Sequence, residues 1–169
     1  MKLKERILPV CRILLLAALF IAAAAVQNSF LGSLKYAVLP LVPLTVAVCA
    51  FEGEMGGLLF GLLGGALYDI ASPAADGVYA LLFAALGCAV GLTMRYLFRS
   101  TLMSVFLLTA AFSLLTSLTG LIFTVFAKDH TGVLAAARAR FLPGAALTAL
   151  LAPLFYYPVR GIETVFRRK

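Results

Sequence analysis

Residues 52–95 read EGEMGGLLFGLLGGALYDIASPAADGVYALLFAALGCAVGLTMR, and this stretch decides the fold. It contains two short apolar segments joined by a turn of proline, glycine and small residues. In the first segment, small residues recur at every fourth position and lead to a carboxylate. Because residues four apart lie on one face of a helix, both segments are expected to be helices with a glycine face. The residues of these faces are Gly53, Gly57, Gly61, Gly65 and Asp69 in the first segment, and Gly87, Gly91 and Arg95 in the second.

A glycine face on a membrane helix indicates close contact with another helix. Without side chains in between, two backbones approach closely, and this packing is a main source of helix association in lipid. Two uses are open for these glycines. They form the seam between the two segments themselves, or they receive a helix of a partner protein.

Composition indicates an integral membrane protein. The chain has 169 residues, of which 63% are hydrophobic and only 12% are charged, whereas soluble domains carry about 25% charged residues. The net charge of +7 is typical of loops that orient membrane helices, so no nucleic acid partner is expected. The three cysteines fall in apolar segments and are interpreted as small buried hydrophobes rather than disulfides or ligands.

We expect one all-α domain, a bundle of six transmembrane helices at about 20 residues each. The first span also suits a secretory signal peptide, although its apolar run is longer than the usual signal core. Arg12 near its start is expected to reach the membrane surface. The expected spans are 7–27, 36–51, 56–71, 78–98, 101–127 and 141–159. Between the last two, 128–140 is expected as a loop, with a short interfacial helix over 134–138 as an alternative for part of it.

The distribution of Lys and Arg places both termini in the cytoplasm. Basic residues gather on the cytoplasmic side of membrane proteins, and with an even number of spans ten of them share one side against four on the other. Glu54 then lies on the same side as Arg95 and Arg99, and Glu54 with Arg95 is the expected ion pair. The ten are Lys2, Lys4, Arg6, Arg12, Arg95, Arg99, Arg160, Arg167, Arg168 and Lys169; the four are Lys35, Lys128, Arg138 and Arg140.

Asp69 is the acidic residue whose position needs explanation. A carboxylate near the end of an apolar helix is costly and indicates a function. It either caps the turn, by accepting backbone N–H groups of Ser72 or of the next helix, or contacts a partner or ligand. Hydroxyl residues along 101–127 are interpreted as a seam whose side chains bond their own helix.

Enzyme signatures are absent from the sequence. One histidine cannot build a paired-histidine metal site, and no G-x-S-x-G motif occurs. Asp69 and Asp76 are separated by a turn, so they are not expected to share a proton as a catalytic pair. We therefore expect no catalytic residues, no metal and no cofactor.

The run from Pro43 to Arg99 resembles the centre of MreD, the rod-shape-determining membrane protein of bacteria. The resemblance rests on the acidic turn and glycines before a short span, on Asp69 before a small-residue turn, and on the basic close at Arg95 and Arg99. The ending FLPGAALTALLAPLFYYPVRGIETVFRRK is similar to the family's proline-bearing last span and basic tail, which here holds Arg160, Arg167 and Arg168.

The resemblance implies a non-enzymatic role in cell shape and lateral cell-wall elongation, in the bacterial cytoplasmic membrane. Implied partners are an MreC-like bitopic protein and, through it, the RodA glycosyltransferase, a class B penicillin-binding protein and MreB. Membrane lipids and a second copy of the chain are further candidate partners. We expect the small-residue faces of 56–71, 78–98 and 101–127 to receive the partner's single span. The family's fold also resembles the substrate-binding subunits of energy-coupling-factor transporters, so a small-molecule-binding transport subunit is the alternative.

Overall fold

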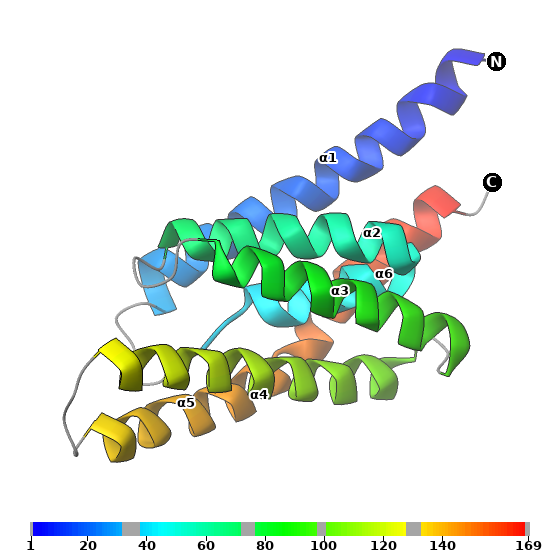
Figure 1. The fold of residues 1–169 in the computed structure, drawn as a ribbon. Coiled ribbons are helices and arrows are strands. Elements are labelled where there is room, and N and C mark those ends of the chain that lie inside the picture. The colour runs from blue at the N-terminus through cyan, green and yellow to red at the C-terminus, as the bar shows by residue number, and fades with distance from the viewer. Residues whose placement is uncertain (1, 32–37, 72–76, 98–100, 128–132, 168–169) are drawn as a thin grey trace.

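The chain is an all-helical bundle in the part that the structure describes. A computed structural model describes residues 2–31, 38–71, 77–97, 101–127 and 133–167 (Figure 1). The elements are α1 (Lys2–Val26), the π-helical turn η1 (Gln27–Leu31), α2 (Leu41–Ala71), α3 (Val78–Tyr96), α4 (Leu102–Ala127), α5 (Val133–Leu150) and α6 (Ala152–Arg167). Within these described residues, five segments are long and apolar enough to cross a membrane: Val10–Ser29, Leu41–Ile70, Val78–Tyr96, Leu102–Phe123 and Leu142–Val165.

Helix α2 folds back on itself at Gly53. The backbone of Gly53 has φ 77° and ψ −165°, outside any helical conformation. The Cys49 thiol lies 3.4 Å from the Gly57 carbonyl oxygen, and the Thr45 hydroxyl lies 2.7 Å from where a Cβ on Gly64 would be. In a straight helix these last two residues would be about 28 Å apart. The two halves, 41–52 and 54–71, are therefore antiparallel neighbours.

This reversal bears on the expected number of spans. Spans were expected at 36–51 and 56–71, with a tight acidic turn at Glu52, Gly53 and Glu54 between them. The structure has two antiparallel helical halves here, separated by the single non-helical residue Gly53. The five membrane-crossing candidates count these two halves as one segment, so the six expected spans stay a prediction. Glycine makes so short a reversal feasible, because a positive φ carries no Cβ penalty there.

The first half of α2 begins inside the bundle. Its helix starts at Leu41 rather than at 36, since 38–40 are not helical, and residues 41–50 are all buried. The Leu39 N–H donates to Thr148 Oγ1 at 3.0 Å and the Leu41 N–H donates to Gln27 Oε1 at 3.4 Å. Prolines at 40 and 43 suit a helix start, where a missing N–H costs little. Twelve residues give about 18 Å of helix, less than the roughly 30 Å hydrocarbon core.

The last expected span, 141–159, is longer in the structure. Helix α5 begins at Val133, inside the expected 128–140 loop, and α6 continues to Arg167. The two helices are separated at Leu151, whose N–H still bonds the Leu147 and Thr148 carbonyl oxygens. Residues 128–132 of the expected loop lie outside the described residues.

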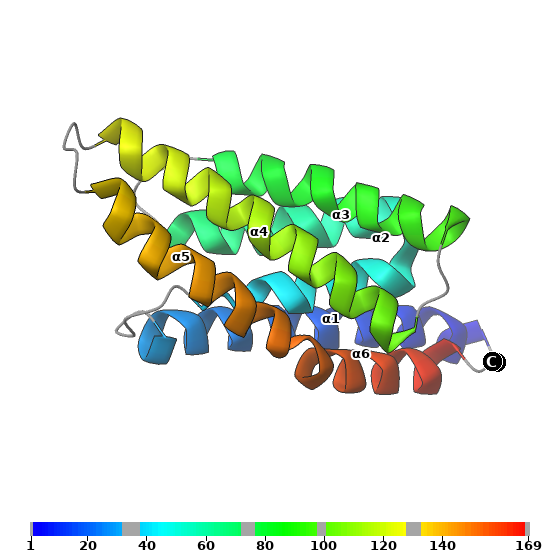
Figure 2. The same cartoon turned by 90° about the horizontal axis from the view of Figure 1, so that it is seen from below.

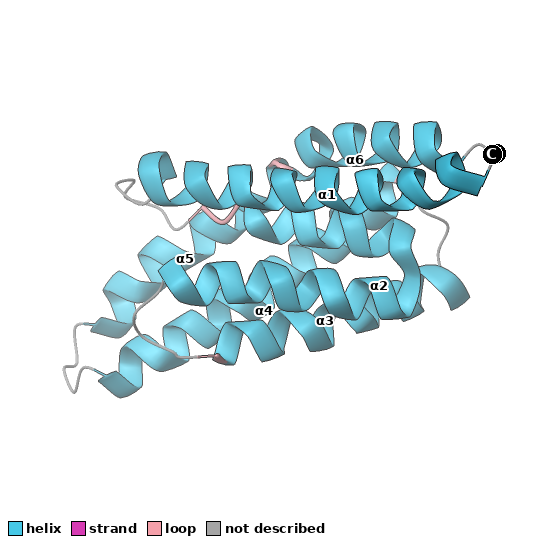
Figure 3. Cartoon of the chain, turned by 90° about the horizontal axis from the view of Figure 1, so that it is seen from above, coloured by secondary structure: helices cyan, strands magenta, loops and turns pink. Residues whose placement is uncertain are grey.

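The helices are arranged around α2. Its pairing with α3 is the most extensive in the molecule, followed by that of α4 with α5. Helices α1 and α6 lie next to each other and run along the first half of α2 (Figures 2 and 3). The N- and C-terminal ends lie at the same end of the bundle (Figure 1). A ring contact of 5.0 Å between Phe83 and Phe112 joins α3 to α4.

Substituting Gly53 by alanine tests the reversal. No atom lies within 4 Å of a Cβ placed there, so the cost is conformational alone, and we expect Gly53→Ala to lower the free energy of unfolding by about 1–3 kcal/mol. Gly161, helical and with equally free space, is the matched control, and alanine there should be neutral or stabilising. Unfolding in detergent measures both. Equal effects at the two sites would contradict a strained reversal at Gly53.

Candidate functional site

The glycine faces of α2 and α3 pack directly against each other. A Cβ added at Gly57 would overlap the carbonyl oxygen of Gly87, and one added at Gly61 would overlap that of Phe83. Gly65 meets the Tyr79 carbonyl oxygen in the same way. The contacts move by four residues along α2 and by four in the opposite direction along α3, which is an antiparallel backbone seam.

The seam also includes the reversal itself. A Cβ on Gly91 would lie 2.6 Å from the carbonyl oxygen of Gly53. Every glycine predicted for the two faces thus lies in one internal interface. The expectation that the glycine face of 56–71 receives a partner helix is therefore wrong, because α3 already fills it. The expectation for Gly87 and Gly91 on 78–98 is wrong for the same reason.

Asp69 closes one end of the seam. It is the next residue after Gly65 in the four-residue series, so its side chain extends past the seam to the start of α3. Asp69 Oδ1 accepts the Tyr79 N–H at 3.2 Å, and Oδ2 accepts the Ala80 N–H at 2.8 Å. Gly77, the residue before α3, makes no side-chain cap. The capping role expected for Asp69 is confirmed, and Ser72 lies outside the described residues.

An ion pair closes the other end of the seam. Arg95 follows Gly91 by four residues, and its Nη1 lies 2.6 Å from Glu54 Oε1. This is the pair expected from the sequence. Both side chains are substantially exposed, at 65% and 34%, so the pair contributes little to stability. The Arg95 guanidinium also lies 5.6 Å from the centroid of the Tyr96 ring. Arg99 lies outside the described residues.

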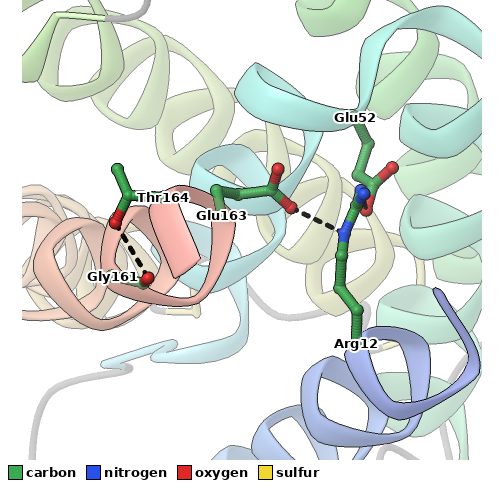
Figure 4. A network of polar contacts seen from close by, with 5 residues as sticks. All are labelled: Arg12, Glu52, Gly161, Glu163 and Thr164. Carbon is green, nitrogen blue, oxygen red and sulfur yellow. Dashed lines mark hydrogen bonds and ion pairs between the residues drawn. The ribbon is translucent and has the colours of Figure 1, made fainter. Parts of the chain in front are cut away.

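A second charged group lies beside the reversal, and the sequence did not reveal it. Arg12 of α1 pairs with Glu52 of α2, and its Nε lies 3.0 Å from Glu163 Oε1 of α6 (Figure 4). Arg12 was expected to reach the membrane surface, which stays a prediction; what the sequence did not reveal is that its side chain is only 20% exposed and faces two carboxylates. Arg12 lies four residues before Leu16, which is fully buried, so both are on one face of α1. This spacing was the signal available for an inward-facing Arg12.

The hydroxyl face of α4 is an internal seam. Thr109 and Thr116 are buried and donate to the carbonyl oxygens of Val105 and Phe112 in their own helix. Ser113 donates to the Ala145 carbonyl oxygen of α5 at 3.3 Å. The seam interpretation of 101–127 is confirmed for these residues.

Beside this seam, α4 and α5 enclose a shallow apolar groove that opens outward. Its volume is about 260 Å³, and it is lined by Ala110, Ser113, Leu114, Leu142, Ala145, Ala146 and Ala149. Within the described ranges, no group of three or more His, Cys, Asp or Glu side chains is placed to hold a metal ion.

Comparison with known families identifies the chain. A family model described as rod shape-determining protein MreD matches residues 5–163, nearly the whole chain. The chain belongs to the MreD family. Membership assigns this MreD-family chain to the membrane proteins that determine rod shape. Comparison with curated proteins and with solved structures found no match. The likeness to energy-coupling-factor transporter subunits therefore stays a prediction.

The basic tail of this MreD-family chain is described only at its start. Arg160 of α6 is exposed, and its guanidinium lies 5.8 Å from the centroid of the Tyr156 ring. Arg168 and the side chain of Arg167 lie outside the described residues. Arg160 and Arg95 are on the helices that lead to the same end of the bundle (Figure 1).

Gly61→Leu tests the seam. The added side chain meets backbone rather than a movable side chain, so α2 and α3 must separate, and we expect folded MreD-family protein to drop sharply. Overpacking a closely packed interior costs about 1–3 kcal/mol or more. Ala85→Leu adds the same side chain on the exposed side of α3 and should have little effect. Size-exclusion chromatography of solubilised membranes gives the folded amounts. Wild-type amounts for Gly61→Leu would contradict the seam.

Asp69 variants test the cap on α3. Asp69→Ala removes both acceptors, and we expect a loss of about 0.5–2 kcal/mol in unfolding free energy. Asp69→Asn keeps one carbonyl oxygen as an acceptor, so its loss should be smaller. Amide hydrogen exchange at Tyr79 and Ala80 should accelerate in the same order. If both variants behave alike and leave exchange at these amides unchanged, Asp69 does not cap α3.

Proposed function

We propose that this chain is a non-enzymatic adapter with several passes through the bacterial cytoplasmic membrane, serving cell shape and lateral cell-wall elongation. It binds an MreC-like bitopic protein, which links it to RodA, a class B penicillin-binding protein and the MreB cytoskeleton. The observation that carries this proposal is the MreD family match over residues 5–163. The same match gives no support to the transport-subunit alternative.

The path of the chain supports a six-pass topology with both termini in the cytoplasm. After the reversal at Gly53, the second half of α2 runs back along the first half. Its far end lies beside the start of α3, where Asp69 accepts the Ala80 N–H. Counting its halves separately gives an even number of passes, and both termini lie at one end of the bundle (Figure 1). That end carries the exposed Arg95 and Arg160, which agrees with the excess of basic residues on the cytoplasmic side. These cations suit contact with anionic lipid.

The groove between α4 and α5 is the surface that best suits the partner's membrane span. The glycine seam is filled, whereas this groove opens outward and four of its seven lining residues are alanines. Small residues allow a helix to approach closely, and in lipid that contact is what drives association. Leu114 and Leu142 border the groove and are exposed, so they are available to pack against the incoming helix.

Pull-down from the chain's own cells tests both parts of the proposal. The tagged protein should recover an MreC-like bitopic protein and wall synthases, identified by mass spectrometry. Filling the groove by Ala110→Leu or Ala146→Leu should reduce recovery of the bitopic protein roughly tenfold, which corresponds to about 1.4 kcal/mol of binding free energy.

Ala111→Leu is the matched control, since this neighbouring residue is exposed but outside the groove. All variants must elute as folded protein in wild-type amounts before recoveries are compared. Undiminished recovery with the groove variants would exclude the groove as the interface. Recovery of ATPase and transmembrane coupling subunits of a transporter, in place of the bitopic protein, would overturn the adapter function itself.

A further inference from the structure

Two ion pairs flank the reversal of α2 and connect it to different helices. Glu52, the last residue of the first half, pairs with Arg12 of α1. Glu54, the first residue of the second half, pairs with Arg95 of α3. Gly53 between them has the positive φ that only glycine adopts easily. One residue thus separates an attachment to α1 from an attachment to α3.

Arg12 also connects α6 to this point. Its guanidinium contacts Glu52 and, through Nε, Glu163 at 3.0 Å (Figure 4). The Glu163 side chain is only 4% exposed. A planar guanidinium presents several donors at once, which lets one cation serve two carboxylates from different elements. Without the cation, the carboxylates of α2 and α6 would be left close together and would repel.

The contacts of α1 elsewhere are different in kind. Its buried face consists of side chains such as Leu16 and Phe20, which are fully buried, and its other faces are exposed at Leu14 and Ile21. Helices that pack through apolar side chains can shift past each other by small sliding movements. The backbone contacts of the α2–α3 seam do not permit this sliding, because nothing in them can rotate away.

We propose that Arg12 acts as a latch at the reversal, meaning an ion-pair contact whose loss changes the arrangement of α1 and α6. It joins α1 to Glu52 of α2 and to Glu163 of α6. Its release lets α1 and α6 part, while the glycine seam keeps α2 and α3 together. The latch goes beyond the proposed adapter function, since it is a property of the single chain and requires no partner.

Spin-label distances in the full chain, reconstituted in lipid nanodiscs, test the latch. In a background with Cys11, Cys49 and Cys88 replaced by alanine, labels at Leu14→Cys and Val165→Cys report on α1 and α6; both positions are exposed. We expect Arg12→Gln to broaden this distance distribution and lengthen its mean by about 2–5 Å, the range of helix shifts and one-turn displacements. Arg12→Lys should give a smaller change.

A second label pair, Leu59→Cys with Leu81→Cys, reports on the seam from exposed positions of α2 and α3. This distance should stay unchanged in Arg12→Gln. Arg95→Gln is the matched control, because it breaks the other ion pair at the same reversal and should leave the distance between 14 and 165 as in the wild type. Glu163→Gln should broaden the distance between 14 and 165, since it frees α6 from Arg12.

An unchanged distance between 14 and 165 in Arg12→Gln would overturn the latch. Broadening of both label pairs would overturn it too, because that is general loosening. If Arg12→Gln does not fold, the triple variant Arg12→Gln, Glu52→Gln and Glu163→Gln removes every charge of the group while keeping side chains of similar size. A broad distance between 14 and 165 in that variant supports the latch, and a narrow one overturns it.

Discussion

Backbone contact between α2 and α3 is the constraint on which the rest of the structure depends. Gly57 and Gly61 bring the two helices so close that no side chain fits between them. In lipid, where apolar side chains gain nothing by leaving their surroundings, such contact is the main attraction between helices. The seam also aligns its own ends, because Asp69 and Arg95 continue the same four-residue series and meet their partners without further adjustment.

An internal seam of this kind determines which surfaces remain for other molecules. Apart from Gly53 at the reversal, the glycines that the sequence makes most conspicuous are covered by the neighbouring helix of the seam. One surface that stays accessible is the outward side of α4 and α5, where alanines line a groove and Ser113 donates inward to α5. The small residues that we propose for the partner's span are therefore the alanines of this groove rather than the glycines of the seam.

The periodicity of the sequence predicted those contacts that recur at a regular spacing along one helix. One four-residue spacing runs through each glycine face and continues to Asp69 in α2 and to Arg95 in α3. The Asp69 cap and the Glu54–Arg95 pair follow from that spacing. The pattern could not say which helix fills a face, so the partner expectation for Gly61 was wrong. The partners of Arg12 were not predicted because its two carboxylates come from helices distant in the sequence. The start of α2 at Leu41 was missed because the acceptors for the backbone there are remote in the sequence. Thr148 accepts the Leu39 N–H, and Gln27 accepts the Leu41 N–H.

The buried start of α2 has a consequence for biogenesis. The acceptor for the Leu39 N–H is the hydroxyl of Thr148, 109 residues further along the chain. During synthesis, this donor leaves the ribosome long before its acceptor exists, and an unsatisfied N–H in hydrocarbon costs several kcal/mol. The Leu39 N–H therefore gains its acceptor only once α5 has been synthesised, so this contact is among those that complete the bundle late.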